Sequence, residues 1–172
     1  MPAEKPSIYL ATICYGGQAH AEYMAALLAF RPACAARGVD LQIDLAAGEA
    51  LVGRGRATLM AKFLATDATH LLFAESDRAF DTKEVFRLLD ANQDVSEVDP
   101  ASGLLLIRRH AAQRMADSHP ELLAHLGDML GLTVSEAVFV FDPLIEPGTG
   151  RYLTDIEAFQ ARWRGLTLSD YR

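Results

Sequence analysis

Blocks of apolar residues recur along this chain at spacings that predict β-strands separated by helices. Residues 8–13 and 70–74 are almost continuously apolar, which is typical of strands buried on both faces. Residues 39–45 alternate between apolar and polar side chains with a period of two, which also indicates a strand. Two further strands are predicted at residues 103–107 and 134–141.

Between these strands, apolar residues recur every three or four positions, as they do on one face of an amphipathic helix. In the first such segment Met24, Leu27 and Leu28 share this spacing and Gly38 provides a stop. Pro32 lies inside the same segment and predicts a kink or a break into two pieces. Helices are predicted at residues 19–37, 56–65, 82–90, 110–118 and 154–164.

The alternation of strands and helices sets the expected fold class. Strand–helix–strand units are right-handed and place their strands in parallel, with helices covering the sheet. We therefore expect an α/β fold, a three-layer sandwich with a mostly parallel central sheet. A length of 172 residues suits one domain, and no linker or internal repeat divides it, so residues 1–172 are expected to form a single domain.

Composition disfavours several classes of partner. The formal charge of −7 argues against a nucleic-acid partner, because contacts to the phosphate backbone need clustered Lys and Arg. No run reaches the roughly 20 apolar residues that a membrane-spanning helix requires. The two cysteines, Cys14 and Cys34, lack the spacing of a zinc site or a disulfide framework. They are expected to be reduced thiols, and the chain is expected to be cytoplasmic.

An acidic pair follows the strand predicted at residues 70–74. Side chains two positions apart in a strand point the same way, roughly 6.5–7 Å apart, so Glu75 and Asp77 are expected to project together from its carboxyl end. Ligands bind at this edge of α/β sheets, and two carboxylates there could hold Mg²⁺ or Mn²⁺ together with phosphate oxygens. The alternative is that the pair only caps the turn into the next element.

A series of short motifs follows in order along most of the chain. The motifs lie at residues 11–17, 22–24, 33–38, 48–49, 54–56, 63–64, 68–73, 75–77, 105–109, 142, 150–153, 158–159 and 162–163. Together they resemble a bacterial and phage group of family-2-like glycosyltransferases with the GT-A fold. The resemblance implies a GT-A-like protein that transfers a sugar from a nucleotide-diphosphate sugar to an acceptor.

In that family a D-x-D-type segment binds a divalent cation and the sugar nucleotide. The resemblance therefore implies that Glu75 and Asp77 hold Mn²⁺ or Mg²⁺, and that Glu75 also contacts the donor. A metal-bridged diphosphate is a good leaving group because the cation offsets the negative charge that develops on it. The family usually has Asp at the first position, where this chain has Glu75, so the metal geometry is expected to shift.

The resemblance also assigns residues around the nucleotide. Tyr15, Gly16 and Gly17 would line it, and Arg54 and Arg56 would face the diphosphate. This placement is physically sensible because helix N-termini and guanidinium groups both favour phosphate. The simpler alternatives are an ordinary tight turn at the two glycines and a solvated helix end at the two arginines.

Two departures from the family pattern bear on activity. Inverting enzymes of the family place a catalytic Asp where this chain has Ile156, which leaves Asp155 and Glu157 as candidate bases. A family segment before residues 103–109 is missing, because residues 94–102 make that connection directly. Two functions therefore stay open: a metal-assisted glycosyltransferase, and a catalytically degenerate homologue that acts as a binding or scaffolding protein. The absence of this segment also predicts an exposed sheet edge or apolar patch, which a homodimer would cover.

Overall fold

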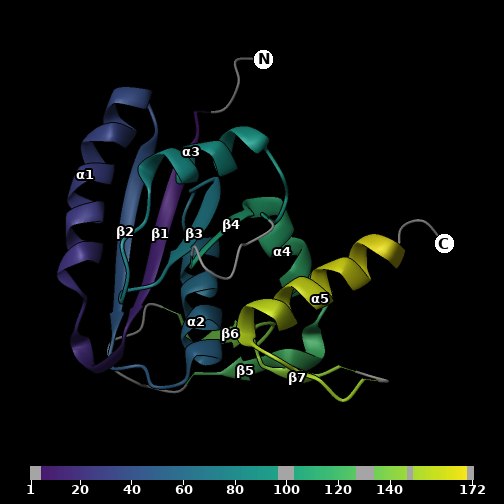
Figure 1. Cartoon of the computed structure of the whole chain (residues 1–172). Coiled ribbons are helices and arrows are strands. Elements are labelled where there is room, and N and C mark those ends of the chain that lie inside the picture. Colours follow the sequence, from purple (N-terminus) through teal and green to yellow (C-terminus); the bar gives the residue numbers. More distant parts are fainter. Residues whose placement is uncertain (1–4, 97–102, 127–133, 147–148, 170–172) are drawn as a thin grey trace.

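The centre of the molecule is a four-stranded sheet with the strand order β2-β1-β3-β4 (Figure 1). β1 (Ser7–Cys14) pairs in parallel with β2 (Asp40–Ala47) on one side and with β3 (His70–Ala74) on the other. β4 (Leu104–Arg108) runs antiparallel to β3 at the far edge. The mixed α/β character and the mostly parallel sheet are therefore confirmed.

The structure is a computed structural model that describes residues 5–96, 103–126, 134–146 and 149–169. Most of the connection expected at residues 94–102 lies outside these ranges, so its prediction is untested. Within the described ranges, no helix is both long enough and apolar enough to cross a membrane.

Helices cover both faces of the sheet (Figure 1). α1 (Ala21–Arg37) and α3 (Thr82–Ala91) pack on one face, and α2 (Val52–Leu64), α4 (Arg109–Asp117) and α5 (Asp155–Ser169) pack on the other. All five predicted helices are present, with α2 beginning four residues earlier than expected. Two apolar layers thus enclose the sheet, as the fold class requires.

The side chains of β1 divide between these two layers. Ile8 and Leu10 are fully buried against α1 and α3, whereas Tyr9 and Ala11 are buried against α2. Successive strand residues point to opposite faces, so a strand covered on both sides needs apolar residues at every position. This is the physical reason for its continuous apolar run.

The first helix differs from its prediction in two respects. α1 continues through Pro32 as one element, so the expected break is absent. Proline has no backbone N–H, so Pro32 cannot donate the helical hydrogen bond to the carbonyl of Leu28. Both residues are exposed, so water can satisfy that carbonyl instead. The buried face of α1 is made by Tyr23, Leu27, Phe30 and Cys34, not by Leu28, which is 70% exposed.

The last third of the chain adds small elements beside the central sheet. β5 (Leu123–His125) pairs with β6 (Glu136–Val138), and β7 (Leu144–Ile145) pairs with β8 (Tyr152–Leu153), both antiparallel. The strand predicted at residues 134–141 is therefore three residues long and lies outside the central sheet. Phe141, the last residue of the predicted range, follows this strand and stacks on Phe159 of α5, with ring centroids 4.5 Å apart.

Candidate functional site

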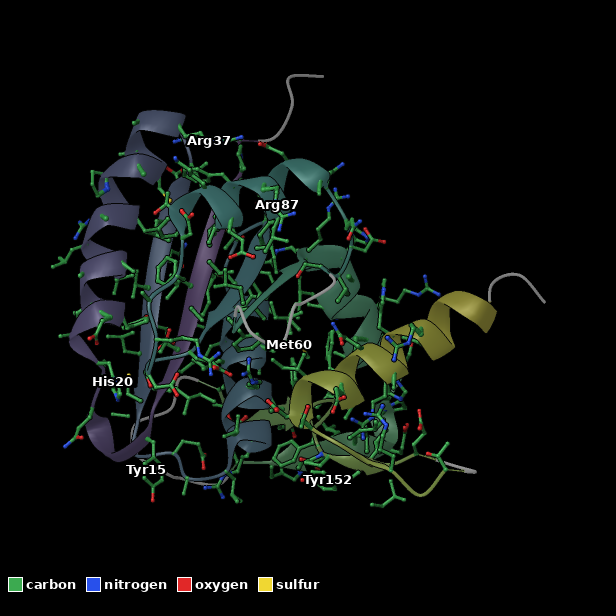
Figure 2. All side chains as sticks on the ribbon, viewed as in Figure 1. Tyr15, His20, Arg37, Met60, Arg87 and Tyr152 are labelled. Atoms are coloured by element: carbon green, nitrogen blue, oxygen red, sulfur yellow. The ribbon has the colours of Figure 1, made fainter. Side chains whose placement is uncertain are left out.

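The order of the strands creates a switch point between β1 and β3. From β1 the chain passes through α1 to β2, and it returns through α2 on the opposite face to β3. Loops that follow β1 and β3 therefore turn away from each other at the carboxyl ends of these strands, and α/β sheets bind ligands in the crevice that results. Figure 2 shows Tyr15 and His20, which follow β1, at this end of the sheet.

A cleft of about 370 Å³ opens at this switch point. It brings together four of the residues predicted from the sequence, namely Tyr15, Arg56, Glu75 and Asp77. Its lining comes from β1, β3 and α2 and from the loops that follow β1, β2 and β3. The remaining lining residues are Ala11, Ile13, Glu49, Val52, Phe73, Ala74, Ser76 and Arg78.

The two carboxylates of the acidic pair converge on one cationic atom. The Arg78 Nε lies 2.9 Å from Glu75 Oε2 and 3.4 Å from Asp77 Oδ1. The other oxygen of Glu75, Oε1, lies 3.9 Å from a terminal nitrogen of Arg56. Glu75 and Asp77 are thus not splayed apart, because a single positive group contacts both.

This arrangement fits the donor chemistry of a divalent cation. Mg²⁺ is usually held by one or two carboxylates and completes its shell with water and phosphate oxygens. The Arg78 guanidinium marks a point that a cation can share between Glu75 and Asp77. Across the described ranges, no group of three or more His, Cys, Asp or Glu side chains is placed to hold a metal.

Arg56 is a buried cation behind the cleft. It is 5% exposed, its guanidinium carbon lies 5.0 Å from the centre of the Phe73 ring, and its Nε lies 2.5 Å from Asp155 Oδ2. No hydrogen bond joins these two atoms, so the contact is an ion pair between two buried atoms. Asp155 is the first residue of α5, and the pair therefore ties α2 to α5 underneath the site.

Arg54 is held by a different partner. Its Nε and a terminal nitrogen donate to the two oxygens of Glu49 at 2.8 and 2.9 Å, and the Leu51 N–H donates to Glu49 at 2.8 Å. The hydrogen bonds from Arg54 are the largest cause of a lowered pKa at Glu49, and they raise the pKa of Arg54. Glu49 lines the cleft but Arg54 does not, so the structure separates the two predicted arginines.

The glycine pair shapes the loop that carries Tyr15. Gly16 and Gly17 have φ values of 63° and 73°, in the left-handed region that side chains rarely adopt. They form a 3₁₀ turn (Tyr15–Gly17), and neither is among the cleft-lining residues. Tyr15 itself is 76% exposed and lines the cleft. The backbone N–H of His20 then bonds to the Ser76 carbonyl at 2.8 Å, which joins this loop to the acidic one.

Glu157 lies at the start of α5 and does not line the cleft. Its carboxylate accepts bonds from the Thr154 N–H at 2.9 Å, the Thr154 hydroxyl at 3.0 Å and Arg151 at 2.9 Å. These bonds, the backbone one first, lower the pKa of Glu157 to about 2. The bond from the Thr154 N–H to the Glu157 carboxylate is one of the two bonds that define a helix capping box. Ile156 packs against the apolar core that contains Phe159.

Sequence reasoning assigned no role to Arg78 or Gly103, and both shape the acidic pair. Gly103 has φ 63°, and a Cβ at this position would lie 3.0 Å from both Arg78 Cδ and Glu75 Oε2. A side chain there would push one of these groups out of place. The sequence offered a signal for Arg78, because it lies three residues after Glu75 and can pair with it. It offered none for Gly103, which comes close to Glu75 only because β4 pairs with β3.

No family model and no curated protein matches the chain.

Proposed function

We propose that this cleft binds a nucleotide-diphosphate sugar with a divalent cation, as in a GT-A-type glycosyltransferase, and that the protein transfers the sugar to an acceptor. The observation that carries the proposal is the convergence of Glu75 and Asp77 on one cationic atom at the switch point of the sheet. Two carboxylates able to share one cation, at the edge where α/β sheets bind ligands, suit a metal-bridged diphosphate.

The charges of the cleft support a role for the cation. Arg56 and Arg78 line it together with the carboxylates of Glu49, Glu75 and Asp77, so the lining is net negative. A diphosphate is itself negative and would be repelled by this surface without an added positive charge. Mn²⁺ or Mg²⁺ would supply that charge and would stabilise the leaving diphosphate.

The side chains around the pair fit the other parts of such a donor. Tyr15 presents an exposed aromatic ring at the rim, on which a nucleotide base can stack. Arg78 is 41% exposed and extends into the cleft, where its guanidinium can donate to phosphate oxygens. Arg56 is too deeply buried to move freely, and it supplies a fixed positive charge beneath the diphosphate.

A second function, donor binding without transfer, is favoured by the state of the candidate bases. The Asp155 oxygen nearest Arg56 is buried in an ion pair, and Glu157 is engaged in capping α5. Neither residue lines the cleft, and Ile156 lies against the core. A catalytically degenerate homologue that binds or scaffolds would have this arrangement, whereas a base needs an oxygen within reach of the acceptor hydroxyl.

The proposal is tested by thermal unfolding with UDP, GDP and their sugars, each with and without Mn²⁺. A ligand at 100 times its Kd adds about 2.7 kcal/mol of stability, which corresponds to a Tm increase of about 5–10 °C for a chain of this size. We expect such an increase with one nucleotide in the presence of Mn²⁺ and its loss in the double variant Glu75→Gln/Asp77→Asn.

Release of free nucleotide diphosphate from the bound donor, measured by chromatography, then separates transfer or hydrolysis from binding alone. An unchanged Tm with every nucleotide, in the presence and absence of Mn²⁺, would contradict donor binding and sugar transfer, and would leave only the scaffolding role of a degenerate homologue.

A further inference from the structure

Arg78 occupies the place between the two carboxylates of the acidic pair. Its Nε contacts Glu75 at 2.9 Å and Asp77 at 3.4 Å, and its side chain is 41% exposed. Gly103 backs this contact, since a Cβ there would approach both Arg78 Cδ and Glu75 Oε2 to 3.0 Å. The absence of a side chain at Gly103, just before β4, thus leaves room for Arg78 and Glu75 side by side.

A guanidinium at this point and a divalent cation shared by the same carboxylates exclude each other. Both need the same oxygens, and two positive groups a few ångströms apart repel strongly at the low effective dielectric of a cleft. Arg78 must therefore leave Glu75 and Asp77 before these two can share a metal. The long, partly exposed side chain lines the same cleft as the pair, so phosphate oxygens there are within its range.

We infer that Arg78 is an internal competitor of the cation, which neutralises Glu75 and Asp77 in the ligand-free protein and shifts to the diphosphate when the donor binds. The inference rests on the proposed function, because it concerns the same cation site. Its consequence is that the protein binds Mn²⁺ weakly alone and more tightly with a nucleoside diphosphate. By linkage, each ligand then raises the affinity for the other by the same factor.

The direct test is titration of Mn²⁺ alone, followed by the electron paramagnetic resonance signal of the free ion. Arg78→Gln removes the competing charge and is expected to bind Mn²⁺ about tenfold or more tightly than the natural sequence, because a neighbouring positive charge is lost. Arg87→Gln is the matched control: Arg87 is an arginine of α3 that pairs at 3.6 Å with Glu84, away from the cleft. Its Mn²⁺ affinity should equal that of the natural sequence.

A second measurement tests whether Arg78 contributes to binding of the diphosphate. At saturating Mn²⁺, Arg78→Gln should bind UDP or GDP about tenfold more weakly, because a charge-assisted hydrogen bond to phosphate is lost. Adding Glu75→Gln to Arg78→Gln should abolish the gain in Mn²⁺ affinity, which assigns that gain to this pair. Arg78→Met, of similar length and uncharged, replaces Arg78→Gln if the latter fails to fold.

The outcomes separate the inference from the function on which it rests. Equal Mn²⁺ affinities in Arg78→Gln and the natural sequence overturn the inference, even if Mn²⁺-dependent nucleotide binding persists. A gain that survives Glu75→Gln overturns it as well, because the ion would then bind elsewhere. If neither protein binds Mn²⁺, with or without a nucleoside diphosphate, the cation site fails and both proposals fall.

Discussion

Asp155→Asn is the change that most directly tests how the site is supported. The substitution keeps the size of the side chain but removes the negative charge that faces Arg56. Arg56 is 5% exposed, and its Nε lies 2.5 Å from the Asp155 oxygen in a buried ion pair. Since Asp155 begins α5, the loss should loosen the attachment of α5 to α2.

The magnitude follows from what remains around Arg56. Removal of one partner of a fully buried ion pair costs about 3–5 kcal/mol, because the other charge stays buried and uncompensated. Here the Asp155 side chain is 19% exposed, Glu75 remains 3.9 Å from Arg56, and the Phe73 ring still faces the guanidinium. These compensations reduce the expected loss of unfolding free energy to about 2 kcal/mol.

The assay is urea unfolding at pH 7, with the free energy extrapolated to water. Glu84→Gln is the control, because Glu84 pairs with the exposed Arg87 at 3.6 Å and such surface pairs contribute less than about 1 kcal/mol. Combining Asp155→Asn with Arg56→Met should show a coupling of about 2 kcal/mol between the two sites. A loss at Asp155→Asn no larger than that of Glu84→Gln would refute the reasoning.

Three further changes test other parts of the structure. Glu157→Gln should destabilise the protein by about 1 kcal/mol in urea unfolding, because it weakens the cap of α5. The pKa of Glu157 is lowered to about 2, so the difference in stability between the natural sequence and this variant should persist above pH 4 and vanish as the pH falls towards 2. Burial first, and then the charges of Arg108 and His110, lower the pKa of His70 to about 4. Protonation of unfolded His70 should therefore erode stability between pH 6.5 and 4, and His70→Gln should flatten this dependence, while the ring of the folded protein titrates near pH 4 by NMR. Arg109→Met should cost more than about 2 kcal/mol in urea unfolding, because the guanidinium donates to four backbone carbonyls, two in the last turn of α2 and two just after it, those of Thr66 and Ala68 at 2.6 and 2.7 Å.

The order and type of the main elements could be predicted because they depend on local apolar spacing. β3 was predicted to the residue, and the stop of α1 at Gly38 is confirmed by its left-handed conformation. The errors arose where tertiary packing chooses among apolar residues. Leu28 has the spacing of a core residue but faces solvent, and residues 134–141 are apolar because Val140 and Phe141 fill the layer beside α5 rather than because they extend a strand.

The site residues that could be predicted from the sequence are those that directly follow a predicted strand. Glu75 and Asp77 follow β3, and Tyr15 follows β1, so the parallel pairing of these strands brings all three to one cleft. Arg54 and Arg56 show the limit of such reasoning. They are two positions apart near the start of α2, which places them on different sides of the helix, one bonded to Glu49 and one buried against Phe73.

Asp155 also bears on the choice between the two proposed functions, because the oxygen that it holds against Arg56 is buried and is not placed to accept a proton from an acceptor. If Asp155→Asn loses about 2 kcal/mol of stability while its donor affinity and its rate of sugar transfer equal those of the natural sequence, the residue supports the fold and is not the base. If the natural sequence transfers sugar, and folded Asp155→Asn loses at least about a hundredfold in kcat with donor affinity unchanged, the residue acts as the base. Transfer by the natural sequence therefore distinguishes an enzyme from a binding protein built on the same cleft, and this variant shows whether Asp155 is the base of that enzyme.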